Sequence, residues 1–151
     1  MSADRELMLT RLIDARREKL YRAWTDATLV KQWFAPLPYT TPVAELDVRP
    51  GGSAFIVMRG PDGTDYPMKG VFLSVTEPER LVFTNIAIDN DGKHPLEGET
   101  TVTFSEEDGK ATLILKTHAV GLVPFAPRML GGMEAGWNQS IDKLQELVTR
   151  S

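Results

Sequence analysis

Glu134 is the carboxylate whose position most favours acid–base chemistry, because it flanks an apolar stripe near the C-terminus, next to Met133. A carboxyl group held against apolar side chains has a raised pKa, and it can then donate or accept a proton near neutral pH. Tyr21, Tyr39 and Tyr66 are further candidates for a proton relay. We interpret Glu134 as reaching solvent at the rim of any cavity, so no residue is assigned as catalytic.

Arg11 is the cation with the most informative neighbours. It lies two residues from Leu9 and two from Ile13, so strict strand alternation would turn its side chain inward. A buried guanidinium would need a partner or the polar head of a ligand. We interpret Arg11 instead as an edge-strand arginine that faces water.

The remaining polar residues do not form a recognisable catalytic or metal site. Glu45, Asp47 and Arg49 alternate with apolar residues and are interpreted as a solvated row of charges. His94 and His118 lack the spacing of a metal site, no serine lies in a nucleophile elbow, and no Gly-rich loop could hold a phosphate. The chain has no cysteine, which excludes thiol nucleophiles and Cys-based zinc sites. We therefore predict no metal and no cofactor.

The composition is that of one ordinary globular domain, which we assign to residues 1–151. Hydrophobic residues make up 42% of the chain and charged residues 25%, with a net charge of −4. This charge offers no basic surface for nucleic acid or for an anionic membrane. No apolar run approaches the roughly 20 residues of a spanning helix, and no signal segment is recognisable at the start, so a cytoplasmic location is expected.

Hydrophobic spacing predicts a strand, two short helices, six more strands and a long helix. The predicted strands are residues 5–13, 43–48, 54–58, 68–75, 81–88, 100–105 and 111–117. The predicted helices are residues 16–24, 26–33 and 133–149. Turn signals such as Pro61-Asp62-Gly63 and Glu107-Asp108-Gly109 separate the strands and indicate an antiparallel sheet.

The C-terminal helix carries one apolar stripe, formed by residues at spacings of three and four: Leu130, Met133, Trp137, Ile141, Leu144 and Val148. Gly131, Gly132 and Gly136 each disfavour a helix interior by about 1 kcal/mol relative to alanine, so the regular helix should begin near residue 133, after an irregular or helical lead-in at 124–130. One helix cannot cover seven flat strands. The sheet must therefore curl around it, which leaves an apolar space near the N-terminal half of the helix, of the roughly 300–1,000 Å³ typical of ligand sites.

Several short motifs follow one another in the order found in a known family. They are Asp14-Ala15-Arg16-Arg17-Glu18, Ala23-Trp24-Thr25-Asp26 with Trp33-Phe34, Arg49-Pro50-Gly51-Gly52, Gly60-Pro61-Asp62-Gly63, Gly70-Val71, Pro78-Glu79-Arg80-Leu81-Val82-Phe83 and Gly136-Trp137. Together they resemble the activator-of-Hsp90-ATPase-like (AHSA1-like) branch of the START/Bet v 1-like (SRPBCC) superfamily, over nearly the whole chain. The resemblance implies an α+β helix-grip fold, in which a curved seven-stranded antiparallel sheet wraps around a long C-terminal helix, with two short helices after the first strand.

The resemblance also bears on function. Related branches bind lipids, sterols, polyketides or plant hormones, and a few are cyclases or hydroxylase components. The eukaryotic namesake is a two-domain co-chaperone, and this chain matches only its later, helix-grip domain. A chaperone partner is therefore not expected from the resemblance.

The predicted function is the binding of a small hydrophobic molecule, such as a lipid, a polyketide or an aromatic metabolite, between the sheet and the C-terminal helix. The candidate ligand-binding residues are Trp137, Met133, Glu134, Leu130, Ile141, Trp33, Met58, Met68, Phe83 and Phe104. Trp24 and Trp33 have an alternative interpretation as core residues that brace the short helices.

Two other functions stay open. A cyclase-like enzyme would need an ionisable group that points into the cavity. An interaction module of the co-chaperone or stress-response kind would instead expose an apolar patch on the sheet face. Self-association into a homodimer, through a sheet edge or the first helices, is a further hypothesis.

Overall fold

The structure is a computed structural model that describes residues 3–35, 39–88, 96–121 and 133–149, with side chains described for 6–35, 39–88, 97–120 and 136–149. The strands are β1 (Ala3–Ile13), β2 (Thr40–Leu46), β3 (Ser53–Arg59), β4 (Asp65–Thr76), β5 (Arg80–Ala87), β6 (Leu96–Glu107) and β7 (Lys110–Gly121). The helices are α1 (Arg17–Thr25), α2 (Ala27–Trp33) and α4 (Met133–Thr149).

The strands form one antiparallel sheet of seven strands in the order β1-β7-β6-β5-β4-β3-β2, which confirms the predicted fold class. The predicted strand at 43–48 is shifted, since β2 already ends at Leu46. The reason is the tight turn that follows, in which the Asp47 amide donates to the Ser53 carbonyl and the Gly52 amide to the Arg49 carbonyl. A side chain at Gly52 would overlap the carbonyl oxygen of Asp47, so only glycine fits there.

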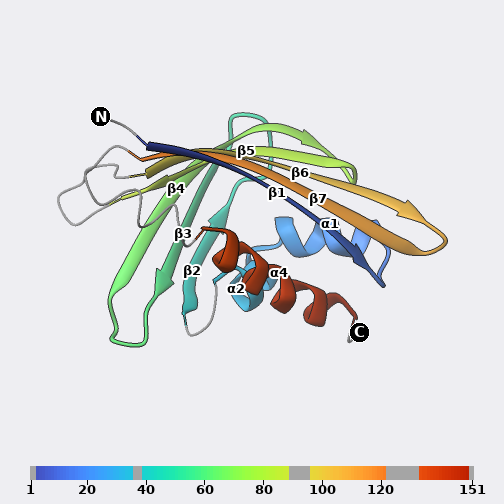
Figure 1. The fold of residues 1–151 in the computed structure, drawn as a ribbon, viewed down its shortest axis with the longest axis horizontal. Coiled ribbons are helices and arrows are strands. Elements are labelled where there is room, and N and C mark those ends of the chain that lie inside the picture. Colours follow the sequence, from blue (N-terminus) through green and yellow to red (C-terminus); the bar gives the residue numbers. More distant parts are fainter. Residues whose placement is uncertain (1–2, 36–38, 89–95, 122–132, 150–151) are drawn as a thin grey trace.

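The sheet is strongly curved, and the described helices all lie on its concave side (Figure 1). Side chains alternate along each strand, so that on β7 the odd-numbered residues from Ala111 to Ala119 are buried. The paired residues of neighbouring strands continue this inner face across the sheet. The core therefore lies between the concave face and the described helices α1, α2 and α4.

The β6–β7 hairpin closes as its turn signal predicts. Asp108 and Gly109 have φ values of 55° and 79°, in the left-handed region that a two-residue hairpin loop requires. Asp and Gly are among the residues that enter this region at low cost, which fixes the register of the two strands.

Two side chains of α4 hold this helix against the end of α2. The Ser140 hydroxyl donates to the Phe34 carbonyl at 2.7 Å, and the Lys143 ammonium donates to the Ala35 carbonyl at 2.8 Å. These carbonyls belong to the C-terminal end of α2, where orphan acceptors and the negative end of the helix dipole favour donors and cations. Burial at this contact lowers the pKa of Lys143.

Arg11 does not face water, and our sequence interpretation of this residue is wrong. Its guanidinium lies 2.8 Å from the Asp142 carboxylate, and it donates to the Asn138 and Gln145 side-chain oxygens at 3.1 and 3.3 Å. Strand alternation does turn the side chain inward, and the polar flank of α4 supplies the partners that a partly buried guanidinium needs. Arg11 thus ties the edge strand β1 to α4.

Within the described residues, no helix has both the length and the apolar character required to cross a membrane.

Candidate functional site

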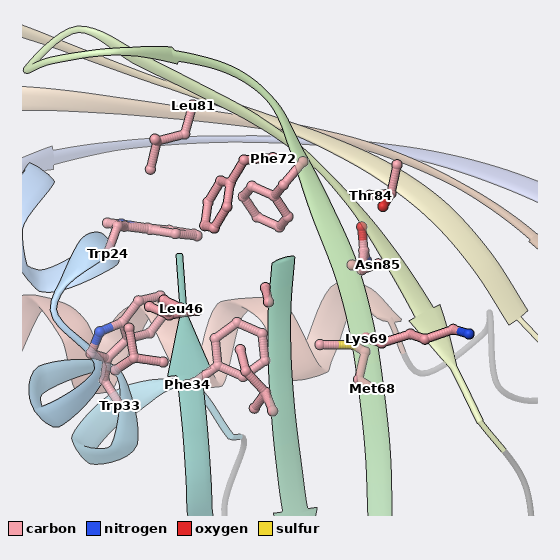
Figure 2. A pocket seen from close by; sticks show the side chains of 15 residues that line it. Trp24, Trp33, Phe34, Leu46, Met68, Lys69, Phe72, Leu81, Thr84 and Asn85 are labelled. Carbon is pink, nitrogen blue, oxygen red and sulfur yellow. The ribbon is translucent and has the colours of Figure 1, made fainter. Parts of the chain in front are cut away.

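An apolar pocket lies between the concave face of β2–β5 and the two short helices (Figure 2). It is lined by Trp24, Val30, Trp33, Phe34, Leu46, Ala54, Ile56, Met68, Lys69, Gly70, Phe72, Leu81, Phe83, Thr84 and Asn85. Its free volume is about 40 Å³, which is room for a few water-sized groups. This is well below the volume expected from the sequence, because aromatic rings occupy much of the space.

Trp24 is the centre of the aromatic cluster that walls the pocket. Its ring lies 4.6 Å from Trp33 and 6.1 Å from Trp137, measured between ring centroids, and 6.3 Å from both Phe83 and Phe104. Such distances are those of interacting aromatic pairs, each of which contributes about 0.5–1.5 kcal/mol beyond burial. The three tryptophans, which come from α1, α2 and α4, therefore form one packed unit.

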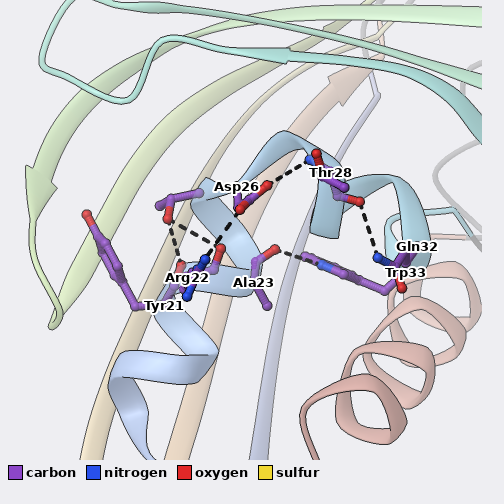
Figure 3. A network of polar contacts seen from close by, with 8 residues as sticks. Tyr21, Arg22, Ala23, Asp26, Thr28, Gln32 and Trp33 are labelled. Carbon is purple, nitrogen blue, oxygen red and sulfur yellow. Dashed lines mark hydrogen bonds and ion pairs between the residues drawn. The ribbon is translucent and has the colours of Figure 1, made fainter. Parts of the chain in front are cut away.

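The corner between α1 and α2 sets the position of Trp24, on α1, relative to Trp33, on α2. Figure 3 shows this corner together with Trp33. Asp26 caps α2 by accepting a hydrogen bond from the Thr28 amide at 2.9 Å. The Trp33 indole nitrogen donates to the Ala23 carbonyl at 2.9 Å, which ties the end of α2 back to α1. The corner is held by hydrogen bonds to the backbone, so the two rings enter the core at a fixed angle.

The indole N–H of Trp24 has no such partner. Among the described side chains, Trp24 Nε1 and Thr41 Oγ1 are buried without a hydrogen bond, and of these two residues Trp24 lines the pocket. Most buried polar groups in proteins are hydrogen-bonded, and leaving a donor unsatisfied costs about 1–3 kcal/mol. An unsatisfied donor at the wall of a pocket is a group that a ligand can satisfy.

The end of the pocket opposite Trp24 is polar, with Thr84 and Asn85 beyond the aromatic rings (Figure 2). Thr84 Oγ1 accepts a hydrogen bond from the Val71 amide at 2.9 Å. Asn85 Oδ1 accepts from Thr100 Oγ1 at 3.0 Å, and Thr100 Oγ1 lies 2.9 Å from Thr117 Oγ1. A line of neutral hydrogen-bonding groups therefore runs from the pocket across β5, β6 and β7.

The structure brings together part of the predicted ligand-binding set. Trp33, Met68 and Phe83 line the pocket. Trp137 and Phe104 contact the Trp24 ring, Ile141 is fully buried in the core, and Met58, on β3, is partly buried and packs against the core. Leu130 and the side chains of Met133 and Glu134 lie outside the described residues. Ligand contact by any of the ten residues stays a prediction.

The predicted ligand-binding set lacked most of the lining residues, namely Trp24, Val30, Phe34, Leu46, Ala54, Ile56, Lys69, Gly70, Phe72, Leu81, Thr84 and Asn85. Leu46 and Ala54 are opposite each other in the β2–β3 register, and alternation within each strand places them on the inner face. That signal was available in the sequence. Asn85 gives no such signal, since its role depends on hydroxyl groups from two other strands.

The candidate acid–base residues and histidines lie away from the pocket lining where they are described. Tyr21 is buried against Phe104, and burial, together with the charge of Glu77, raises its pKa. Tyr39 and Tyr66 pair with each other, with ring centroids 5.8 Å apart. Within the described ranges, no group of acidic or histidine side chains is arranged to hold a metal ion.

Solved structures share this fold. The AHSA1 protein from Silicibacter pomeroyi is 27% identical, with a TM-score of 0.78 over 97% of this chain and 100% of that one. A protein from Nitrosomonas europaea is 26% identical, with a TM-score of 0.78 over 96% and 94% of the two chains. A protein from Rhizobium leguminosarum has a TM-score of 0.89 over 100% and 98%, at 22% identity, which shows the fold alone.

A search of curated proteins found no match. The family model described as "Activator of Hsp90 ATPase homolog 1-like protein" matches residues 14–149, which include both short helices, the strands from β2 to β7 and α4. The match covers far more than half of the chain and agrees with the fold. The chain belongs to the family of activator of Hsp90 ATPase homolog 1-like proteins.

Proposed function

We propose that this chain binds a small hydrophobic molecule in the pocket between the sheet and helices α1 and α2. The observation that carries the proposal is an aromatic-walled pocket whose polar groups are few and, apart from Lys69, neutral. Ligand sites in proteins have this composition: an apolar lining with a small number of placed hydrogen-bonding groups. The unsatisfied indole N–H of Trp24 is further support, because a ligand would offset its cost.

The aromatic lining of the pocket favours a flat molecule over a long acyl chain. A free volume of about 40 Å³ does not admit a ligand of even one ring unless side chains move. Met68 is an unbranched, adaptable side chain in the lining, and Phe83 is only partly buried. When these side chains shift, an aromatic ligand can stack against rings that already pair with one another, such as Phe72 and Phe83.

The lining supports binding over acid–base catalysis. Among the described lining residues, Lys69 is the one ionisable side chain, and its amine points away from the aromatic rings (Figure 2). A general acid or base must lie within hydrogen-bonding reach of the reacting group. The pocket instead offers the amide of Asn85, the hydroxyl of Thr84 and the indole of Trp24.

The test is a titration with a panel of one-ring and two-ring aromatic compounds and medium-chain fatty acids. Binding is measured by the change in tryptophan fluorescence and by the shift in thermal unfolding. Binding should change the fluorescence, because the three tryptophans are packed together next to the pocket. A ligand at a hundred times its Kd should stabilise the fold by about 2.7 kcal/mol. Aromatic compounds are expected to bind more tightly than the fatty acids.

A matched pair of variants locates the site. Ala54→Val adds two methyl groups inside the pocket, whereas Ala87→Val adds the same groups on the inner face outside the lining. Binding should be lost in the first variant and kept in the second, with both still folded by circular dichroism. Equal binding by both variants, or no binding to the wild type across the panel, would contradict the proposed function.

A further inference from the structure

The hydroxyl groups of Thr100 and Thr117 form a buried donor chain that ends on Asn85. The register places Phe83 opposite Thr100 and Thr100 opposite Thr117, so alternation puts both threonines on the inner face. Thr100 is fully buried and Thr117 is 3% exposed. Asn85, two residues after Phe83 on β5, reaches this chain and also lines the pocket.

The number of hydroxyl protons determines which group donates in each hydrogen bond of this donor chain. Each threonine has a single hydroxyl proton, and Thr100 uses its proton on Asn85 Oδ1. The hydrogen bond between the threonines is therefore donated by Thr117. All three oxygen atoms then have a partner, and both hydroxyl protons are used.

The opposite direction leaves a proton without an acceptor. If the Asn85 amide were flipped, its nitrogen would donate to Thr100, Thr100 to Thr117, and the Thr117 proton would need a further acceptor. The described residues provide no such acceptor for Thr117 Oγ1. Leaving a buried hydroxyl proton without an acceptor is unfavourable, and this sets the orientation of the amide.

The amide nitrogen of Asn85 is consequently the atom available to the pocket. Among the described residues, no acceptor is bonded to its Nδ2 atom, although its Oδ1 atom is held by Thr100. Trp24 Nε1 is a second donor without a partner in the same lining. The lining hydroxyl, Thr84 Oγ1, already accepts from the Val71 amide.

We infer that the ligand is an uncharged molecule that carries a hydrogen-bond acceptor, such as a ketone or quinone carbonyl, and that Asn85 Nδ2 donates to this acceptor. This inference rests on the proposed function and adds the chemical class of the ligand. An anionic group is disfavoured, because Lys69, the one cation among the described lining residues, points away from the rings. Thr100 and Thr117 are positioning residues, which fix the amide through Oδ1 without touching the ligand.

The experiment compares indanone with indane, two probes of nearly the same shape that differ by one carbonyl. A hydrogen bond contributes about 0.5–1.5 kcal/mol net, so indanone should bind the wild type roughly 2- to 12-fold more tightly. The Asn85→Leu variant should bind the two probes equally. In nuclear magnetic resonance spectra, the side-chain NH₂ signals of Asn85 should move with indanone and stay in place with indane.

Thr100→Val is the second variant, since it keeps the size of the side chain and removes the hydroxyl that holds Oδ1. The freed amide can rotate, so the preference for indanone should shrink while indane binding is unchanged. Equal binding of both probes to the wild type, or a preference that survives Asn85→Leu, would overturn the inference and leave the proposed function standing. No binding of either probe, in a protein that binds other aromatic compounds of the panel, would also overturn it. If no compound of the panel binds to the wild type, the proposed function itself is wrong, and this result is distinct from those above.

Discussion

Replacing Arg11 with methionine tests the contact between β1 and α4. Methionine keeps the apolar stem and removes the guanidinium, whose side chain is 24% exposed. The pair with Asp142 contributes about 0.5 kcal/mol, because the Asp142 side chain is 66% exposed and screened by solvent. Three longer hydrogen bonds, to Asn138 and Gln145, contribute about 0.5 kcal/mol each.

The expected loss is therefore about 2 kcal/mol in the free energy of unfolding, or a fall in Tm of about 4–8 °C for a chain of this length. The assay is urea unfolding followed by circular dichroism. Arg16→Met is the matched control, since its side chain is 73% exposed and its nearest carboxylates lie 3.8 and 3.9 Å away. The control should change stability by less than about 0.5 kcal/mol.

Two results would refute this reasoning. Equal stability of the Arg11→Met and Arg16→Met variants would mean that Arg11 faces water in solution. A double-mutant cycle between Arg11→Met and Asp142→Ala should give a coupling of about 0.5 kcal/mol. A coupling near the full 2 kcal/mol would mean that the ion pair, and not the set of neutral acceptors, carries the contact.

Three further outcomes are expected. Ser140→Ala should destabilise the fold by about 1–3 kcal/mol in urea unfolding, because it leaves the buried Phe34 carbonyl without its 2.7 Å donor, and an unchanged midpoint would contradict that contact. Gly70→Ala should lower stability by about 1–3 kcal/mol or more, since its Cβ would overlap a backbone carbonyl of β5, and a tolerated alanine would show that the two strands lie further apart. The raised pKa of Tyr21 means that the folded protein holds this phenol proton more tightly than the unfolded chain, so its contribution to stability is complete below pH 10 and is lost as pH rises through the folded-state pKa. Tyr21→Phe should therefore lose less stability than the wild type above about pH 10, measured as urea midpoints across the alkaline range.

Strand alternation and turn residues were enough to predict the fold, whereas single side chains on an edge were harder to predict. The Asp108-Gly109 hairpin follows from local backbone preferences alone. Arg11 shows the difficulty. The alternation of side chains along its strand predicted that it points inward, but the hydrogen-bonding partners that make its burial favourable come from a helix more than a hundred residues away. Pattern reasoning within one segment cannot supply such partners.

The site was predictable only where its residues follow a local pattern. Met68 and Phe83 stand on the inner faces of their strands, as apolar residues in alternating segments do. The donor chain through Asn85 and Thr100 depends on the register between strands, and one residue of slip would place those groups on opposite faces. The small volume of the pocket could not be predicted either, because it depends on how the aromatic rings pack together.

The pairing of β1 with β7 determines when this chain can complete its fold. The first strand pairs along its whole length with β7, which begins at Lys110. During synthesis, β1 therefore cannot pair until most of the chain has been made. Closing such a long loop is slow, and folds dominated by distant pairings typically take milliseconds to seconds. Until β7 is available, β1 lacks its one neighbouring strand in the sheet. Met8 and Leu12, on its outer face, are exposed in the folded protein as well. Refolding from urea should accordingly be limited by the pairing of β1 with β7, and the contact of α4 with Arg11 should form after that step.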